Sequence, residues 1–533
     1  MIEGERPPPA PPAGRAALLV AVGIFCSRLA GLVRLRVFAY YFGLQSDAAD
    51  AFNAAFRIPN FLQNLFGEGA LSASFIPVYA ALASKGERHE ADRVAGAVAS
   101  LLALVVALLV LVGVLATPVL IAAIAPGFSG AKRDLTIEIV RVLFPGAGLL
   151  ALSAWCLGVL NSHHRFLLSY LAPVVWNAAM IATLALFGAQ ASLPRLAVLL
   201  AWGSVVGSAL QLAVQVPVVL RVAPDLRFVL DVTSEHVRTV TRNFAPVFIS
   251  RGVVQISAYI DTLLASLLPT GAVTGLSNAQ LLYTLPVSLF GMSVSAAELP
   301  AMSSAGTDRS GEDTLVRRLD SGLRQIAFFV VPSAMAFLAL GDVVAAALLQ
   351  TGRFRHTDAV YVWGILAGSA IGLLASTLGR LYASTYYAMR DTRTPLRYAL
   401  VRVGLTTVLG YLFAIPLPRW LGIPAVWGAA GLTISAGIAG WVEMLMLRRT
   451  LNARIGTTGL PAVYVVKLWL ASASGAAMGW VVKAAWRPTN PLVAAILILV
   501  PYGVVFFAVA LALRIPEASR TLGRLTARPG QVR

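Results

Sequence analysis

Apolar stretches long enough to cross a lipid bilayer recur along the chain from Ala16 to Leu513. A transmembrane helix needs about 20 mostly apolar residues, and no polar stretch between these runs is long enough to fold by itself. Only 12% of the residues are charged, against roughly a quarter in a soluble domain. The pattern therefore predicts an all-α polytopic membrane protein and excludes a soluble one.

Fourteen runs qualify as membrane spans. They lie near residues 16–42, 51–82, 94–124, 138–160, 166–189, 194–220, 243–268, 272–302, 325–349, 358–388, 396–416, 421–447, 462–482 and 490–513. The runs at 51–82 and 272–302 are interrupted by polar residues, so a count of thirteen stays open.

The basic residues indicate how the spans are oriented. Most of the 42 Lys and Arg residues lie in the two tails and in alternate loops on one side, and loops rich in Lys and Arg face the cytoplasm. Both termini are therefore expected in the cytoplasm. The net charge of +18 would suggest nucleic acid as the partner of a soluble chain, but here it is a topology signal and nucleic acid is not expected.

Short sequences recur at nearly one offset, which indicates two related halves. The run Phe25–Arg28 (FCSR) resembles Phe248–Arg251 (FISR), and the Leu-Phe-Gly triplet at 65–67 recurs at 289–291. Internal repeats are typical of transporters, which bind their substrate between them. We expect two pseudo-symmetric six-helix lobes followed by two extra helices. The expected segments are a disordered N-terminal extension (1–15), an N-lobe (16–222), a cytoplasmic linker (223–242), a C-lobe (243–447), two C-terminal helices (448–513) and a basic cytoplasmic tail (514–533).

Charged residues inside the first span are the main functional signal. An ionisable side chain at membrane depth is costly and marks a candidate site. Arg28 and Arg34 both lie in this span, and we expect them to face one cavity, where guanidinium groups suit an anionic ligand such as phosphate. The structural alternative is that they form ion pairs with Asp50 and Glu68 of the second span.

The second half carries its own charged residues at membrane depth. Arg251 repeats the position of Arg28 and is a further cavity candidate. Asp261 follows in the same span. It is either paired with Arg402 of the eleventh span or available for Na⁺ or H⁺ coupling, and the sequence leaves both open.

The run from Ser27 to Pro77 carries a specific signature. It reads Ser-Arg-x-x-Gly-x-x-Arg, then Asp-Ala-Phe, Arg-Ile-Pro-Asn and Phe-Gly-Glu-Gly-Ala-x-Ser-x-x-Phe-Ile-Pro, and a further match is the segment Tyr387–Pro395. In these motifs the chain resembles the MurJ-type lipid II flippases of bacterial cell-wall (peptidoglycan) synthesis, which belong to the multidrug/oligosaccharidyl-lipid/polysaccharide exporter superfamily.

The resemblance implies a multi-pass carrier of the bacterial cytoplasmic (inner) membrane. Such a carrier moves lipid II, an undecaprenyl-pyrophosphate-linked disaccharide-pentapeptide, to the periplasmic leaflet by alternating access of a cationic central cavity. The membrane potential is a sufficient driving force, and Na⁺ or H⁺ coupling is optional. The resemblance further implies a monomer that contacts lipid II and membrane lipids, with the two extra helices contributing to a groove for the lipid tail, and it implies no enzymatic activity, metal or cofactor.

The resemblance also assigns site residues. The matching positions are Arg28, Arg34 and Asp50 in the first two helices, and Asn60 and Glu68 in the second-helix motif. Gln63 and Gln280 stand where the family commonly carries Arg. A glutamine donates hydrogen bonds to phosphate oxygens without charge assistance, and the sequence leaves open whether these two positions change the cargo.

The sequence leaves two other classes of function to compare, an exporter of a different cargo and an enzyme. An exporter of another lipid-linked oligosaccharide, a polysaccharide or a drug fits the same superfamily, because the two glutamines weaken the anion signature. An enzyme of lipid-linked sugar chemistry would display carboxylates or histidines at the outer face, where the loops are short, so it is not expected. The chain has no Gly-x-x-x-x-Gly-Lys-Ser/Thr phosphate loop, so nucleotide is not expected either.

Overall fold

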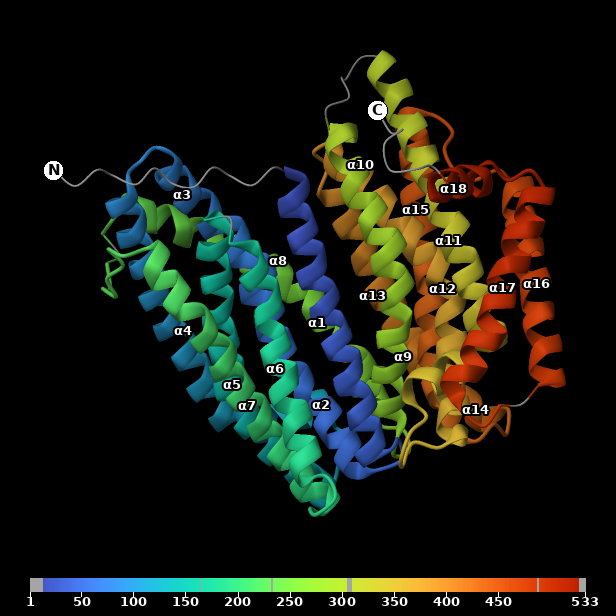
Figure 1. The fold of residues 1–533 in the computed structure, drawn as a ribbon, viewed down its shortest axis with the longest axis horizontal. Helices are drawn as coiled ribbons and strands as arrows, with labels where there is room; N and C mark the ends of the chain where they lie inside the picture. Colours follow the sequence, from blue (N-terminus) through green and yellow to red (C-terminus); the bar gives the residue numbers. More distant parts are fainter. Residues whose placement is uncertain (1–12, 164, 232, 304–308, 487, 527–533) are drawn as a thin grey trace. The chain divides into compact units, whose positions relative to one another are not determined.

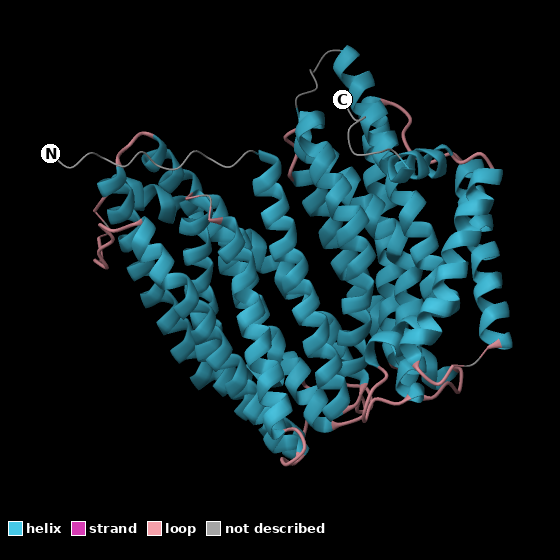
Figure 2. Cartoon of the chain, viewed as in Figure 1, coloured by secondary structure: helices cyan, strands magenta, loops and turns pink. Residues whose placement is uncertain are grey.

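The computed structural model describes residues 13–163, 165–231, 233–303, 309–486 and 488–526 (Figure 1). These residues form helices joined by short loops and contain no strand (Figure 2). The predicted all-α class is therefore confirmed. Contacts between residues divide the chain into two compact units, of which the first ends at Leu263 and the second begins at Leu264.

The first unit contains helices of very different lengths. In chain order they are α1 (Ala13–Phe42), α2 (Asp47–Gln63), the π-helix η1 (Asn64–Leu71), α3 (Ser72–Ser84), α4 (Arg88–Ile124), α5 (Gly130–Ser162), α6 (Phe166–Phe187), α7 (Leu193–Val222) and most of α8 (Glu235–Ser266). Helix α5 packs against α2, α4 and α7, and α1 packs against α6. Val237 and Val240, from the segment predicted as a linker, are buried in the apolar core of this unit.

The second unit has a longer run of helices. They are α9 (Ala272–Pro286), the π-helix η2 (Val287–Met292), α10 (Ser293–Ser303), α11 (Arg309–Leu349), α12 (His356–Ala388), α13 (Arg393–Ala414), the short α14 (Pro416–Trp420), the 3₁₀ turn η3 (Ala425–Trp427), α15 (Gly428–Ile455), α16 (Ala462–Ala485), α17 (Pro491–Ala512) and α18 (Pro516–Thr526). Helix α12 packs against α11 and α15, while α16 and α17 form a hairpin that packs against α11.

Helices α12 and α15 approach closely enough to require glycine. A Cβ atom added to Gly372 would lie 2.4 Å from the Cα atom of Gly437. Backbones that meet through small residues are typical of helix packing in membranes, where van der Waals contact replaces the hydrophobic effect between helices. This pair of glycines therefore sets the spacing of the two helices.

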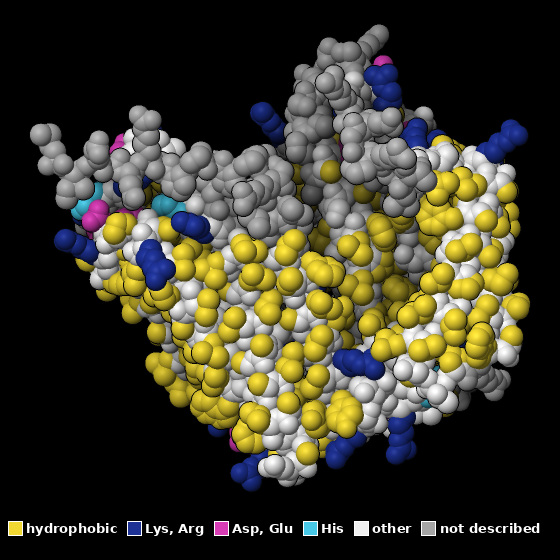
Figure 3. All heavy atoms as spheres, in the orientation of Figure 1, with side chains coloured by type: hydrophobic (Ala, Val, Ile, Leu, Met, Phe, Trp, Pro, Cys, Tyr) yellow, Lys and Arg dark blue, Asp and Glu magenta, His cyan; other side chains and the backbone are white. Residues whose placement is uncertain are grey.

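Among the described residues, eleven helical segments are long and apolar enough to cross a membrane. They match eleven of the fourteen predicted spans, and apolar side chains cover much of the visible flank of the helices (Figure 3). On α4, for example, Leu104, Leu108, Leu115 and Val119 are exposed. The three remaining predicted spans, near 16–42, 51–82 and 243–268, are helical but are not among these eleven segments of the described residues. A multi-pass membrane protein is thus confirmed, and a count of fourteen is not.

The two interrupted runs are continuous helices with a π-helical segment inside each. Residues 47–84 contain η1 and residues 272–303 contain η2. The repeated Leu-Phe-Gly triplets at 65–67 and 289–291 lie within η1 and η2 respectively. Segments of π-helix are rare and occur frequently at functional sites. The sequence repeat therefore coincides with a repeat of an unusual backbone feature.

Candidate functional site

The Arg34 side chain of α1 lies beside aromatic rings contributed by two other helices of the first unit. Its guanidinium carbon is 4.8 Å from the ring centroid of Phe56 on α2 and 5.4 Å from that of Trp176 on α6. The two rings stack with centroids 5.5 Å apart and planes at 9°. One guanidinium nitrogen, Nη1, contacts the Met180 sulfur at 3.5 Å. Arg34 is thus held by cation–π and thioether contacts, and no carboxylate among the described residues forms an ion pair with it.

The rings around Arg34 are themselves fixed in place. Trp176 and Met180 are four residues apart on α6, so they face the same side of that helix. The indole N–H of Trp176 donates to the Ser204 backbone oxygen on α7 at 3.1 Å. Phe52 also stacks on Phe56, with ring centroids 5.2 Å apart. These contacts pre-organise the position of the guanidinium.

Among the described residues, Asp50 forms an ion pair with Lys132 of α5. Its Oδ2 atom lies 2.9 Å from Nζ of Lys132 at the start of α5, and it is 1% exposed. Lys132 also pairs with Asp47 at 3.1 Å and lies over the Phe128 ring. Sequence reasoning missed Lys132, because it falls between the predicted spans at 94–124 and 138–160. Asp50 therefore connects α2 to α5 in the folded unit.

Arg28 and Arg34 have different surroundings. At 100° per residue, a spacing of six residues turns the two side chains about 120° apart. Arg34 packs inward, whereas Arg28 is exposed. Among the described residues, neither has a carboxylate partner. In the described part of the chain Asp50 pairs with Lys132, and the Glu68 side chain, the other partner in the structural alternative, is not described. A cavity shared by Arg28 and Arg34 stays a prediction.

A second polar cluster lies between α2 and α8. The Tyr259 hydroxyl donates to the Arg57 backbone oxygen at 3.2 Å, and the Tyr259 and Phe61 rings meet edge to face at 5.7 Å. Asp261 attracts the Arg57 guanidinium. Asn60, which lies on α2 within this region, is partly buried. The carboxylate of Asp261 therefore has a cation of the same unit beside it.

Arg402, the partner considered for Asp261, forms an ion pair within the second unit. Its Nε atom on α13 is 3.4 Å from Oε2 of Glu443 on α15. Arg380 on α12 adds a second positive charge near Glu443, and the Tyr283 hydroxyl of α9 shares a 2.6 Å hydrogen bond with Ser376. Glu443 is twelve residues from the end of α15, which is about 18 Å along the axis. This cluster was not predicted as a site, since Arg402 was considered from the sequence only as a partner of Asp261.

Of the four other predicted site residues, only Gln280 has a described side chain. The side chains of Gln63, Glu68 and Arg251 lie outside what the structure describes, although the helical backbone at these positions is described. Gln280 is exposed on α9, and its backbone oxygen accepts a hydrogen bond from Thr284 at 2.7 Å.

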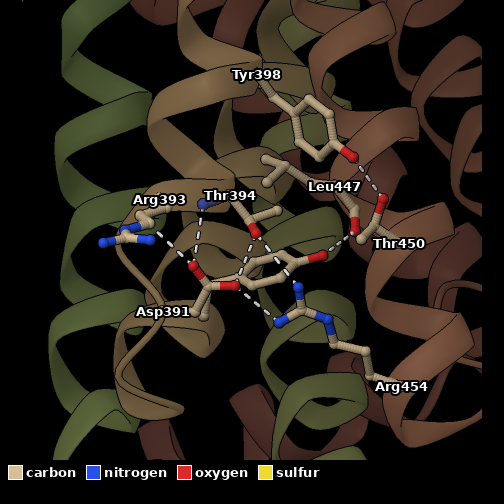
Figure 4. A network of polar contacts seen from close by, with 8 residues as sticks. Asp391, Arg393, Thr394, Tyr398, Leu447, Thr450 and Arg454 are labelled. Carbon is tan, nitrogen blue, oxygen red and sulfur yellow. Dashed lines mark hydrogen bonds and ion pairs between the residues drawn. The ribbon is translucent and has the colours of Figure 1, made fainter.

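The motif at 387–395 forms a structural clasp between α12, α13 and α15 (Figure 4). Asp391 accepts hydrogen bonds from the backbone N–H groups of Arg393 and Thr394, each at 3.0 Å, and from the Thr394 hydroxyl at 2.7 Å. Its Oδ2 atom also pairs with Arg454 at 2.8 Å. The Thr394 hydrogen bonds and the Arg454 charge hold the pKa of Asp391 well below its usual range. Asp391 therefore caps the N-terminus of α13 and links it to α15 through Arg454.

Known proteins resemble the chain over most of its length. The sequence model of the family described as "Lipid II flippase MurJ" matches residues 38–511. A lipid II flippase MurJ of Burkholderia cenocepacia is 32% identical over 446 residues, which cover 83% of this chain and 84% of that protein. A probable lipid II flippase MurJ of Rhizobium tropici is 31% identical, with 80% and 79% covered.

Solved structures share the fold. A lipid II flippase MurJ in an inward closed conformation has a TM-score of 0.76 at 24% identity, over 93% of this chain and 99% of that one. An inward-facing multidrug transporter of the MATE family has a TM-score of 0.66 at 16% identity, over 82% and 98%. The likeness in fold agrees with the family match, which spans far more than half of the sequence. The chain belongs to the MurJ family of lipid II flippases.

Proposed function

We propose that this chain flips lipid II from the cytoplasmic to the periplasmic leaflet of the bacterial cytoplasmic membrane, and that Arg34 takes part in binding the pyrophosphate. Membership of the family supports flipping of this cargo and a role in peptidoglycan synthesis, as a transporter and not an enzyme. The observation that carries the role of Arg34 is its guanidinium, held by Phe56 and Trp176 without a carboxylate partner among the described residues.

The cargo explains why such an arginine is retained. An arginine at the centre of a membrane helix costs about 2.5–3.5 kcal/mol on insertion scales, so a cation there needs a compensating benefit. The pyrophosphate of lipid II is an anion that cannot cross hydrocarbon unaided, whereas the prenyl tail stays in the bilayer. A fixed guanidinium offsets the dehydration of that anion, because its planar donors match phosphate oxygens.

The membrane potential supplies a sufficient driving force in this proposal. Moving one unit charge through the field is worth about 2.3 kcal/mol per 100 mV. An inside-negative potential favours export of the anion and returns an empty, positively charged site to the inner side. The Arg57 guanidinium beside Asp261 favours a carboxylate neutralised by the chain itself over one that must bind Na⁺ or H⁺, so the proposal includes no coupling ion.

We also propose how the carrier moves, how it lies in the membrane and what it contacts. Alternating access would come from movement of one unit against the other, as in other transporters with internal repeats. Both termini would lie in the cytoplasm, and the carrier would act as a monomer in contact with membrane lipids. Export of a different lipid-linked oligosaccharide is the remaining candidate, because glutamine stands at positions 63 and 280.

Complementation tests this proposal. A bacterium depleted of its own lipid II flippase should grow when it expresses this chain, and Arg34→Ala should abolish growth while Arg34→Lys retains part of it. Arg195→Ala, at an exposed arginine near the start of α7, is the control and should support growth. Equal growth of the three variants at equal membrane levels would remove Arg34 from the proposal, and failure of the unmodified chain would remove lipid II as cargo.

A further inference from the structure

A pocket of about 430 Å³ lies entirely within the second unit, where α11 and α16 end and α17 begins. Its apolar floor includes Val343 and Ile498, which belong to a buried cluster of α11, α16 and α17. Its polar wall includes Asp342, Lys483 and His356. None of these residues takes part in the site around Arg34.

Asp342 and Lys483 form a buried ion pair in the wall of this pocket. Nζ of Lys483 lies 2.5 Å from Oδ2 of Asp342, whose side chain is 7% exposed. The other carboxylate oxygen, Oδ1, is also buried and accepts no hydrogen bond from the part of the chain that the structure describes. A buried carboxylate oxygen without a donor is costly. The pocket therefore lacks one hydrogen-bond donor beside a negative charge.

Aromatic residues place the pocket at the level of lipid headgroups. Trp480 and Trp486 both line it and are 50% and 62% exposed. Exposed tryptophans at the ends of membrane helices are typical of the interface between hydrocarbon and water. Lys483 lies two residues before the end of α16, and its Nζ is 4.8 Å from the Trp480 ring centroid. An apolar floor below a charged, aromatic rim suits an amphiphile.

We infer that this pocket binds a phospholipid whose headgroup carries both a phosphate and a primary ammonium, as phosphatidylethanolamine does. The ammonium has three N–H donors, as a lysine does, and supplies the donor that Oδ1 of Asp342 lacks. The remaining N–H groups of Lys483 can donate to the phosphate, and His356 lines the same pocket. A trimethylammonium headgroup has no N–H to donate, and a glycerol headgroup has no positive charge, so the arrangement discriminates between these lipids.

The lipid that stays bound to the purified chain tests this inference directly. The full chain is purified from nanodiscs that contain equal parts of phosphatidylethanolamine, phosphatidylcholine and phosphatidylglycerol, and bound lipid is counted by native mass spectrometry. We expect phosphatidylethanolamine to be retained about ten-fold over phosphatidylcholine, as loss of one hydrogen bond to a charged group implies. Ala494→Phe fills the pocket without altering the ion pair, and it should abolish the preference, as should Asp342→Asn.

Two controls make the result specific. Asp134→Asn removes a carboxylate of the first unit, outside the pocket, and should leave the preference unchanged. Soluble phosphoethanolamine is added in a separate arm. If it stabilises the detergent-solubilised chain as much as the lipid does, the ligand is a soluble amine and the lipid assignment is wrong. Equal retention of the three lipids by the unmodified chain, or a preference that survives Ala494→Phe in a folded protein, overturns the inference.

Discussion

The guanidinium of Arg34 lies over the face of the Phe56 ring, with its carbon 4.8 Å from the ring centroid. The geometry matters because the ring attracts the cation without neutralising it. A carboxylate in the same place would leave no net charge for a substrate. Aromatic support therefore positions the arginine and keeps its charge available.

Removing the ring should impair transport more than stability. Phe56→Leu deletes a cation–π contact worth about 0.5–2 kcal/mol and releases the guanidinium. We expect lipid II flipping to fall several-fold. Phe52→Leu is the matched control, because Phe52 is buried on the same helix and stacks on Phe56 without a contact to Arg34. Thermal unfolding of the two variants should be similarly lowered, so a transport defect of equal size in both would contradict a role for the Phe56–Arg34 contact.

Breaking the Lys132–Asp50 pair should destabilise the first unit. Lys132→Met leaves the Asp50 carboxylate buried beside fewer positive charges, and removing one partner of a buried pair typically costs about 3–5 kcal/mol. Asp50→Asn should cost less, because Lys132 keeps Asp47 as a partner. Thermal unfolding in detergent of both variants and of the double variant gives the coupling energy. Strictly additive effects would show that the pair contributes nothing to the fold.

The pH dependence of stability should follow two carboxylates outside the membrane spans. Hydrogen bonds from Thr233 lower the pKa of Asp231 to about 2, and the Thr394 hydroxyl and Arg454 lower that of Asp391. An unfolded aspartate titrates near a pKa of about 3.9. The stability these groups contribute is therefore complete above that pH and is lost as the pH falls below it.

Asp391→Asn checks this pH effect. The unfolding temperature of the unmodified chain should fall steeply from about pH 4 downward, and the variant should start lower and fall less steeply. Glu87→Gln is the control, since it changes a carboxylate of the α3–α4 turn that forms no ion pair with described residues. Parallel pH curves for the Asp391 variant and the unmodified chain would be inconsistent with a depressed pKa at Asp391.

The glycine contact between α12 and α15 predicts a strong effect of one methyl group. Gly372→Ala places a Cβ atom 2.4 Å from a backbone atom of Gly437, and overpacking of this kind costs about 1–3 kcal/mol. Gly404→Ala on α13 is the control, because a Cβ atom there meets nothing within 4 Å. It should be neutral or stabilising, since alanine favours helix over glycine by about 1 kcal/mol. Equal unfolding temperatures for the two variants would refute the contact.

Much of the architecture could be predicted from hydrophobicity alone. Eleven runs of apolar residues became helices long enough to cross the bilayer, because in lipid a helix satisfies its own backbone hydrogen bonds. The Leu-Phe-Gly repeat located both interruptions, although its π-helical form was not foreseen. A change in hydrogen-bond register has no simple sequence signal beyond nearby Pro and Gly residues.

The partners of the charged residues could not be predicted in the same way. Arg34 was identified from its place in an apolar run, but Phe56 and Trp176 look like ordinary core residues until α2 and α6 are packed together. An ion pair of Asp50 with an arginine was one alternative from the sequence, and the fold gives it Lys132 from the first turn of α5, far along the chain. Such pairings depend on helix rotation and crossing, which single-sequence periodicity does not determine.

The most direct test of the account measures flipping by the purified chain in liposomes. Lipid II is placed in one leaflet, and its arrival in the other is followed by its accessibility to an enzyme outside the vesicle, with and without an imposed potential. Arg34→Gln keeps a hydrogen-bond donor and removes the charge. The account predicts at least a ten-fold lower rate for Arg34→Gln, about the effect of losing one charge-assisted hydrogen bond, with a smaller loss for Arg34→Lys. An unchanged rate for Arg34→Gln in correctly folded protein would contradict the proposal that this cation binds the pyrophosphate.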